Sequence, residues 1–210
     1  MAAQRTSKRL QLIPIVGAAV LLAALALSGC SAQSATTPAK PTSGAPAPHA
    51  TEVSPSGDIP DNQAYVPFTD PTGAFSVTVP EGWAQSTADG ATVFADKLNI
   101  IALRSATSAT APTVASATQN EVAALKSSGG NFSLKKVAAF TRPGGSGVLI
   151  TFQSDSAVNQ VTGSVVRNDV EQYLFWKAGT RVTVTLTSPQ GSDNVDPWAK
   201  VTGSFVWLTK

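Results

Sequence analysis

Histidine and cysteine are nearly absent from this sequence, which contains one of each, His49 and Cys30. His49 falls in a Pro-rich segment and Cys30 directly follows an apolar leader, so a Ser-His-Asp or Cys-His catalytic site on the folded domain is excluded. A zinc site built from cysteine and histidine is excluded on the same grounds. One cysteine cannot form an internal disulfide, so the folded part must be stabilised by core packing.

Net charge is also low once the leader is set aside. The formal charge of +2 comes from Arg5, Lys8 and Arg9, the only charged residues among the first 29. The remainder has 12 basic side chains (15 minus 3) against 13 acidic ones, a net charge of −1. Nucleic-acid binding proteins carry a basic footprint, so we expect no nucleic-acid partner. The sequence also lacks a phosphate-binding glycine loop, and we expect no cofactor and no metal.

The first thirty residues have the three parts of an export signal. The positive start is followed by an apolar run from Leu10 to Leu27, and small residues lead up to Cys30. The run Leu27-Ser28-Gly29-Cys30 resembles the lipobox of bacterial lipoproteins at every position. This resemblance implies that residues 1–29 are a signal peptide and that the Cys30 thiol is joined to a diacylglycerol. It also implies that the peptide bond before Cys30 is cut and that the freed amine can be acylated, for example with palmitate.

Two other interpretations of this segment remain open. The apolar run is near the lower length limit of a membrane-spanning helix, so it can be an uncut anchor. It can also be an ordinary secretory signal in which Cys30 is incidental. We prefer lipidation because Cys30 is the only cysteine and falls at the required place. The predicted location is the extracytoplasmic face of the cell membrane, with the lipid on Cys30 holding the chain there.

Residues 30–64 have the composition of a linker. They are rich in Ser, Ala, Thr and Pro, contain no aromatic residue, and have Val53 and Ile59 as their only large aliphatic residues. Such a segment buries too little apolar surface to offset the entropy lost on ordering. We predict a disordered, proline-stiffened spacer that spans roughly 30 Å. Composition does not decide whether its Ser and Thr residues carry sugars.

From Tyr65 to Lys210 the pattern is that of a folded domain. Apolar and polar residues alternate over residues 75–79, as expected for a half-buried strand. The segment 170–176 is apolar on both faces, which predicts a strand covered on both sides. Residues 170–177 and 181–187 are predicted to form a hairpin around Ala178-Gly179, with the aliphatic residues of 181–187 on one face and its threonines on the other. Further strands are predicted at 91–95, 99–103, 132–140, 148–152 and 204–208, the last as a strand or an extended tail. Helices are predicted over residues 112–128, with apolar residues near one face, and after an N-cap at Asp196. This order predicts an α+β domain in which helices pack on an antiparallel sheet.

Two stretches of the domain resemble PsbP-like domains, the group that includes LpqN-type lipoproteins of actinobacteria. The first is residues 73–83 (GAFSVTVPEGW), a strand that ends in Pro-x-Gly-Trp. The second comprises residues 170–173 (VEQY), 185–187 (TLT) and 193–207 near the end of the chain. These are motifs of fold and not of catalysis. The resemblance implies a sheet with helices on its faces, and an accessory or binding protein more often than an enzyme.

Three residue groups are candidates for chemistry in the domain. Asp193-Asn194-Val195-Asp196 offers oxygen ligands for calcium, but it lacks the glycine and glutamate of a calcium loop, and a helix-capping role is preferred. Asp169 and Glu171 share one face of a strand, and paired carboxylates can cleave glycosides, although solvated acids are the simpler interpretation. The aromatic residues can line a groove for a lipid, glycan or peptide, but core packing is preferred. They are Trp83, Trp176, Trp198, Trp207, Tyr173 and Phe175.

The sequence therefore predicts a membrane-anchored, non-catalytic binding or accessory module of the cell envelope. Its expected partners are the membrane, through Cys30, and an envelope protein or lipid. One alternative is a carrier or chaperone for an apolar envelope molecule, which requires a cavity lined by aromatic residues. A weaker alternative is a carboxylate-dependent hydrolase of wall polymers.

Cys30→Ala tests the lipid anchor. We expect the variant to accumulate as an uncut, unlipidated precursor, because a thiol is needed to form the thioether. Metabolic labelling with a fatty acid and the size of the product check this expectation. A variant that is still cut at the same bond and stays equally membrane-bound contradicts the lipoprotein interpretation.

Overall fold

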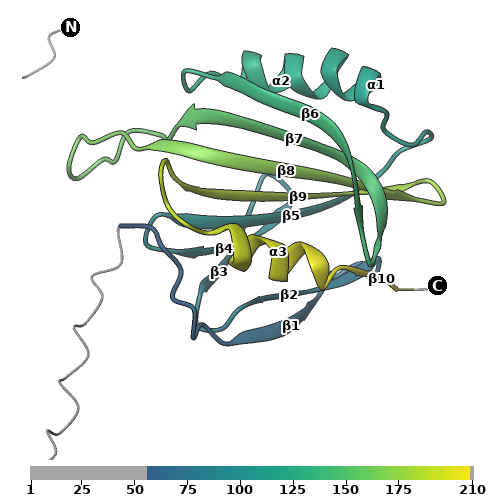
Figure 1. Cartoon of the computed structure of the whole chain (residues 1–210), viewed down its shortest axis with the longest axis horizontal. Coiled ribbons are helices and arrows are strands. Elements are labelled where there is room, and N and C mark those ends of the chain that lie inside the picture. The colour runs from purple at the N-terminus through teal and green to yellow at the C-terminus, as the bar shows by residue number, and fades with distance from the viewer. Residues whose placement is uncertain (1–55, 209–210) are drawn as a thin grey trace, which may run out of the picture. The chain divides into compact units, whose positions relative to one another are not determined.

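Two antiparallel sheets and three helices form the part of the chain that the structure, a computed structural model, describes: residues 56–208 (Figure 1). This arrangement confirms the predicted α+β class. Cys30, the export signal over residues 1–29 and the spacer as far as residue 55 lie outside the described residues. Within the described part, no helix is long and apolar enough to cross a membrane.

Strands lie both before and after a helical segment, as the sequence pattern predicts. The strands are β1 Tyr65–Thr69, β2 Phe75–Pro80, β3 Ala84–Ala88, β4 Ala91–Asp96, β5 Asn99–Thr107, β6 Ser133–Arg142, β7 Gly145–Asp155, β8 Arg167–Lys177, β9 Thr180–Pro189 and β10 Val206–Trp207. The helices are α1 Val114–Gln119, α2 Glu121–Ser127 and α3 Val195–Gly203.

The larger sheet contains seven strands in the order β3-β4-β5-β9-β8-β7-β6, and the smaller sheet has the order β1-β2-β10. All neighbouring strands pair antiparallel. The predicted hairpin between β8 and β9 is confirmed, with Ala178 and Gly179 as its turn. Both turn residues have positive φ, 46° and 83°, which matches the twist of the strands that they join.

The main core lies between one face of the seven-stranded sheet and a layer made of the smaller sheet and α3 (Figure 1). Three phenylalanine rings from distant parts of the chain stack through its centre. The centroid of Phe205 lies 4.0 Å from that of Phe175 and 5.4 Å from that of Phe75. All three side chains are fully buried, so this stack joins β2, β8 and the end of α3 by burial of large apolar area.

A second, smaller core lies on the opposite face of the same sheet, beneath α1 and α2. Ala117 of α1 packs there against Ile150 of β7 and Leu174 of β8 as one buried cluster. Tyr173 and Phe175, the neighbours of Leu174, face the main core. The prediction that β8 is covered on both sides is therefore confirmed.

The predicted continuous helix over residues 112–128 is wrong, because the helix is interrupted at Asn120. The backbone of Asn120 has φ −104° and ψ −60°; its N–H closes α1 and its C=O accepts the first bond of α2. Thr113 and Ser116 form a capping box at the start of α1. Along the predicted apolar face, Ala117 is buried, Val122 and Leu125 are partly buried, and Val114 is 40% exposed.

The folded part begins earlier than Tyr65. Ile59, assigned to the spacer, is 5% exposed and belongs to the main core. Its N–H donates to Oδ1 of Asn194 at 2.8 Å, and the C=O of Gly57 accepts from the side chains of Asn99 and Asn194 at 2.8 Å each. Both asparagines are buried, and their amides are satisfied by this segment. The boundary at residue 64 is corrected accordingly.

The start of α3 also differs from the prediction. The residue before the helix is Asn194, and Asp196 lies within the first turn. The side chain of Asn194 makes no capping hydrogen bond, because it is engaged with Gly57 and Ile59. The predicted N-cap at Asp196 is therefore wrong, whereas the predicted short helix and the closing strand β10 are confirmed.

Gly147→Ala is expected to destabilise the fold, because a Cβ at this strand position would lie 2.1 Å from the carbonyl oxygen of Leu174 on the neighbouring strand. We expect a loss of roughly 2 kcal/mol or more in the free energy of unfolding, since backbone must move. The matched control is Gly203→Ala in α3, where nothing lies within 4 Å of the added methyl group. The control should be neutral or stabilise by up to about 1 kcal/mol. Equal effects in chemical denaturation contradict the close strand packing.

Candidate functional site

The two faces of the seven-stranded sheet are covered to different extents. The smaller sheet and α3 cover one face, whereas α1 and α2 pack on the other face only over β6, β7 and β8. Beside α2, over β4, β5, β9 and β8, lies a hollow of about 560 Å³. A second hollow of about 460 Å³ lies at the C-terminal end of α2. The two hollows share Leu125, Ser128 and Thr185, and together we name them the α2 groove.

The floor of the α2 groove consists of threonines from β9. Val182, Val184 and Leu186 of this strand are fully buried in the main core. Thr183, Thr185 and Thr187 alternate with them and therefore face the groove. Nε2 of Gln172, from the adjacent β8, donates to Oγ1 of Thr185 at 3.3 Å. The predicted division of β9 into apolar and threonine faces is thus confirmed, and it supplies a floor of hydroxyl groups.

Two arginines lie along the same groove. Arg181 of β9 forms an ion pair with Glu121 at the start of α2. Its Nε is buried and has no hydrogen-bond partner among the described residues. Arg104 of β5 donates to the backbone oxygen of Asp89 in the β3–β4 turn. The groove therefore presents hydroxyl, amide and guanidinium groups, which bind oxygen-bearing ligands through hydrogen bonds.

A separate hollow of about 520 Å³ lies at the opposite end of β9, beside the β8–β9 turn. Its lining includes Lys177, Ala106 and Trp207, with Leu208 at the end of the described chain. Trp207 is its only aromatic residue, so this hollow differs from a cavity lined by several rings. Asp70 lies behind it, buried and bound to the hydroxyls of Thr72 and Ser105.

Most of the aromatic residues singled out in the sequence pack in the core. Phe175, Tyr173 and Trp198 are 0%, 3% and 4% exposed. Trp83 packs edge-on against Trp198, with the ring centroids 6.4 Å apart. Nε1 of Trp176 donates to the backbone oxygen of Ser108 at 2.9 Å. The preferred core interpretation holds for Phe175, Tyr173 and Trp198, and Trp83 and Trp207 pack against the main core, whereas Trp176 belongs to neither core. Trp207 alone among the six lines one of the hollows described above.

The candidate carboxylates each have a hydrogen-bond donor beside them. Asp169 accepts from Nε2 of Gln153 at 2.8 Å, and Glu171 accepts from the hydroxyl of Tyr173 at 2.7 Å. The structure places both on the same face of β8, as predicted. Their oxygens are thus engaged in contacts between neighbouring strands and within β8.

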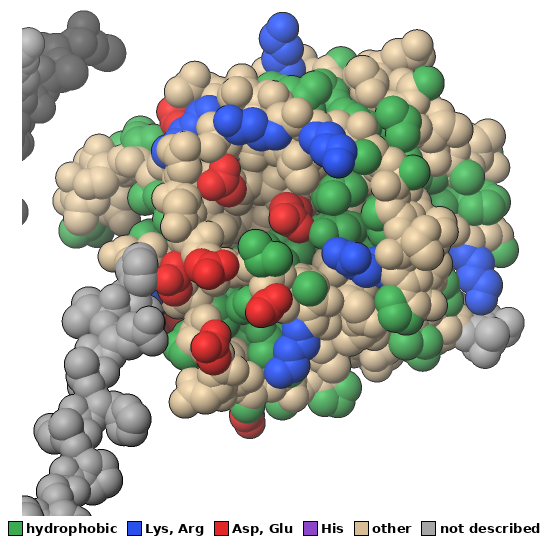
Figure 2. Space-filling view, viewed as in Figure 1, with side chains coloured by type: hydrophobic (Ala, Val, Ile, Leu, Met, Phe, Trp, Pro, Cys, Tyr) green, Lys and Arg blue, Asp and Glu red, His purple; other side chains and the backbone are tan. Residues whose placement is uncertain are grey.

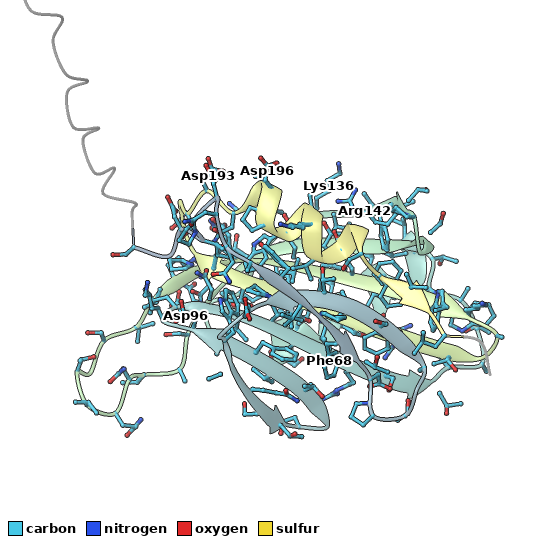
Figure 3. The ribbon with its side chains drawn as sticks, turned by 90° about the horizontal axis from the view of Figure 1, so that it is seen from below. Phe68, Asp96, Lys136, Arg142, Asp193 and Asp196 are labelled. Atoms are coloured by element: carbon cyan, nitrogen blue, oxygen red, sulfur yellow. The ribbon has the colours of Figure 1, made fainter. Side chains whose placement is uncertain are left out.

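The acidic run before α3 contacts the first residues of the described part of the chain. Acidic side chains gather over this end of α3 (Figure 2), and Asp193 and Asp196 point outward there (Figure 3). The N–H of Asp193 donates to Oδ1 of Asp58 at 2.9 Å. Over residues 56–208, no three carboxylate, histidine or cysteine side chains are grouped as metal ligands. The loop therefore docks residues 57–59, and because Asn194 makes no capping hydrogen bond to α3, the preferred capping interpretation is not confirmed.

Tyr173 lies in a polar cluster at the margin of the main core. Its hydroxyl donates to Glu171 and lies 3.4 Å from Nη2 of Arg142, whose Nε donates to Oγ1 of Thr202 at 3.2 Å. Burial raises the pKa of Tyr173 to about 12, and the negative charge of Glu171 adds to the shift. Arg142 opposes it by favouring the phenolate. This cluster, which links β6, β8 and α3, is not apparent from the sequence.

No known family model matches this chain, and no curated protein matches it in sequence. Its fold is similar to that of the PsbP protein CyanoP from Synechocystis, with 15% identity, a TM-score of 0.49, and coverage of 73% of this chain and 99% of that one. LpqN of Mycobacterium tuberculosis, described as involved in cell envelope biogenesis, has 14% identity, a TM-score of 0.42, and coverage of 71% and 93%. Both groups named by the sequence resemblance are thus among its structural neighbours.

A protein from Bacteroides thetaiotaomicron is also similar, with 15% identity and a TM-score of 0.42. The alignment covers 69% of this chain and 48% of that protein, so the chain spans about half of its length. All three TM-scores are below 0.5.

The titration of Tyr173 tests the polar cluster. The chain has two tyrosines, so Tyr65→Phe leaves Tyr173 as the only phenol. We expect its ultraviolet absorbance to titrate with a midpoint at about 12, and Glu171→Gln to lower this midpoint. Because the folded pKa is raised, stability is unaffected below the ordinary value near 10 and falls as pH rises toward 12. A midpoint near 10 with an intact circular-dichroism spectrum contradicts the cluster.

Proposed function

We propose that this chain is a lipid-anchored lipoprotein on the extracytoplasmic face of the cell membrane, and that its domain is a non-catalytic binding module of the cell envelope. The lipobox ending at Cys30 supports the anchor, and the Pro-rich residues 31–55 support a spacer between lipid and domain. The α2 groove is the observation that carries the binding function. It is an accessible channel in which hydroxyl, amide and guanidinium groups stand among apolar side chains of a rigid sheet, and rigid elements hold binding groups most accurately.

The chemistry of the groove indicates the class of ligand. Its threonine hydroxyls and the guanidinium groups of Arg104 and Arg181 offer hydrogen-bond donors along the groove. We therefore propose a ligand rich in hydroxyl or carbonyl oxygens, such as an envelope glycan or an extended polypeptide segment.

A carrier of an apolar envelope molecule is the second candidate. The hollow beside Trp207 supports it, because Ala74, Ala106 and Leu208 add apolar surface to the indole ring. We rank it lower because Lys177 and several hydroxyl groups share the same lining. A hydrolase acting through Asp169 and Glu171 is ranked below both, since each carboxylate already accepts a hydrogen bond from a neighbouring side chain.

The α2 groove is tested by site-specific photocrosslinking of the full lipidated chain in cells. A photoreactive residue replaces Ser128, which lies where the two hollows meet. We expect a defined adduct with one envelope component, identified by mass spectrometry. Thr185→Phe fills the floor of the groove and should abolish the adduct, whereas Thr185→Val keeps the groove open and should retain most of it.

The matched control places the same photoreactive residue at Ser164, an exposed serine in the β7–β8 loop. Adducts that are identical at Ser128 and Ser164, or unaffected by Thr185→Phe, contradict the α2 groove as the binding site. Adducts with acyl lipid at Trp207 instead of Ser128 favour the carrier.

A further inference from the structure

Most sheet edges in the described part of the chain carry features that oppose the addition of another strand. At one edge of the seven-stranded sheet, β6 has a register shift between Leu134 and Lys136 and two adjacent lysines. In the smaller sheet, β1 contains Pro67, and β10 is only two residues long. Bulges, lysines, prolines and short strands are the devices that protect sheet edges from unwanted pairing.

The remaining edge, β3, has none of these devices. Its sequence, Ala84-Gln85-Ser86-Thr87-Ala88, contains no charge and no proline, and every residue is exposed. It pairs with β4 in unbroken register, from Ala84 opposite Ala95 to Ala88 opposite Ala91. A flat, uncharged, exposed edge is a template for another strand.

The turn that follows β3 determines which backbone groups are free. Asp89 and Gly90 both have positive φ, 48° and 72°, as in a two-residue hairpin loop. In such a hairpin, the residues that flank the loop form a hydrogen-bonded pair, and pairs alternate along the ladder. Ser86 and the two alanines therefore bond to β4, whereas Gln85 and Thr87 direct their N–H and C=O groups outward.

The strand is complementary to itself about Ser86. In an antiparallel pair of two copies centred there, Gln85 of one copy lies opposite Thr87 of the other, and the two residues exchange backbone hydrogen bonds. Ala84 then lies opposite Ala88, and Ser86 opposite Ser86. No charged or bulky side chains meet, and the arrangement has the closed two-fold symmetry common in homodimers.

We propose that β3 is an interaction surface for a second copy of this chain, and that two copies join edge to edge into one continuous antiparallel sheet. The contact comprises little more than one strand from each copy. The surface area that it buries is therefore smaller than the roughly 1,200 Å² total of a stable interface. The association is therefore weak and reversible in dilute solution. No residue of β3 itself lines the α2 groove, which reaches this hairpin only through Asp89 in the turn and Ala91 of β4.

Disulfide trapping tests this pairing in the full chain. Cys30→Ser removes the only native thiol, so an introduced cysteine is the sole one and the result does not depend on lipidation. Ser86→Cys places two thiols at a non-hydrogen-bonded pair, where Cα atoms lie about 4.5 Å apart and a disulfide fits. We expect Ser86→Cys to give several-fold more covalent dimer under mild oxidation than the exposed control Ser164→Cys.

Two substitutions at position 87 separate backbone pairing from side-chain effects. Thr87→Pro removes an outward N–H without breaking a bond to β4 and should reduce cross-linking of Ser86→Cys to the level of the control. Thr87→Val keeps this N–H and should leave cross-linking unchanged.

Charge exchange provides an independent measurement if Thr87→Pro fails to fold. Ser86→Lys and Ser86→Glu, each alone in the otherwise unaltered full chain, should abolish concentration-dependent association in sedimentation, and their mixture should restore it. Cross-linking of Ser86→Cys equal to that of Ser164→Cys overturns the proposal, as does dimer formation by Ser86→Lys alone. A disulfide from Ser86→Cys to a different protein also overturns it and identifies β3 as a site for a foreign strand.

Discussion

The unequal covering of the two faces of the seven-stranded sheet is the constraint from which the other features follow. A sheet must bury at least one apolar face, and this one has a core on each side. On one side, the smaller sheet and α3 enclose the stack of Phe75, Phe175 and Phe205. On the other side, two short helices cover only β6 to β8. The strands beyond them carry threonines and alanines, because those residues tolerate contact with water.

This division separates stability from binding within each strand. In β9, Val184 is fully buried in the main core while its neighbours Thr183 and Thr185 line the α2 groove. The apolar half of the strand thus holds its backbone rigidly, and the polar half presents hydroxyl groups in fixed positions. Because side chains point alternately to the two faces of a sheet, the strand itself presents an ordered polar surface, and no separate loop is required.

The first described residues are fixed to the domain by an interaction that local pattern does not reveal. Asn99 and Asn194 are 95 residues apart, yet their side chains lie 3.2 Å from each other and both donate to the backbone oxygen of Gly57. Detaching the segment would break the hydrogen bonds of both buried amides. This costs free energy, because buried polar groups would be left without partners. Residues 57–59 are therefore held at the start of α3.

Much of the local structure was determined by the sequence itself. Alternation in residues 75–79 and 181–187 predicted the strands and their buried faces correctly, because side-chain direction in a strand repeats every two residues. The lipobox at Cys30 is likewise a local motif, and it stays a prediction. Tertiary structure alone decided the break at Asn120, the burial of Ile59, the Glu171–Tyr173–Arg142 cluster, the α2 groove and the exposed edge of β3. Each of these depends on which strands become neighbours and how much of a sheet a helix covers, and such long-range geometry is not contained in the periodicity of any one segment.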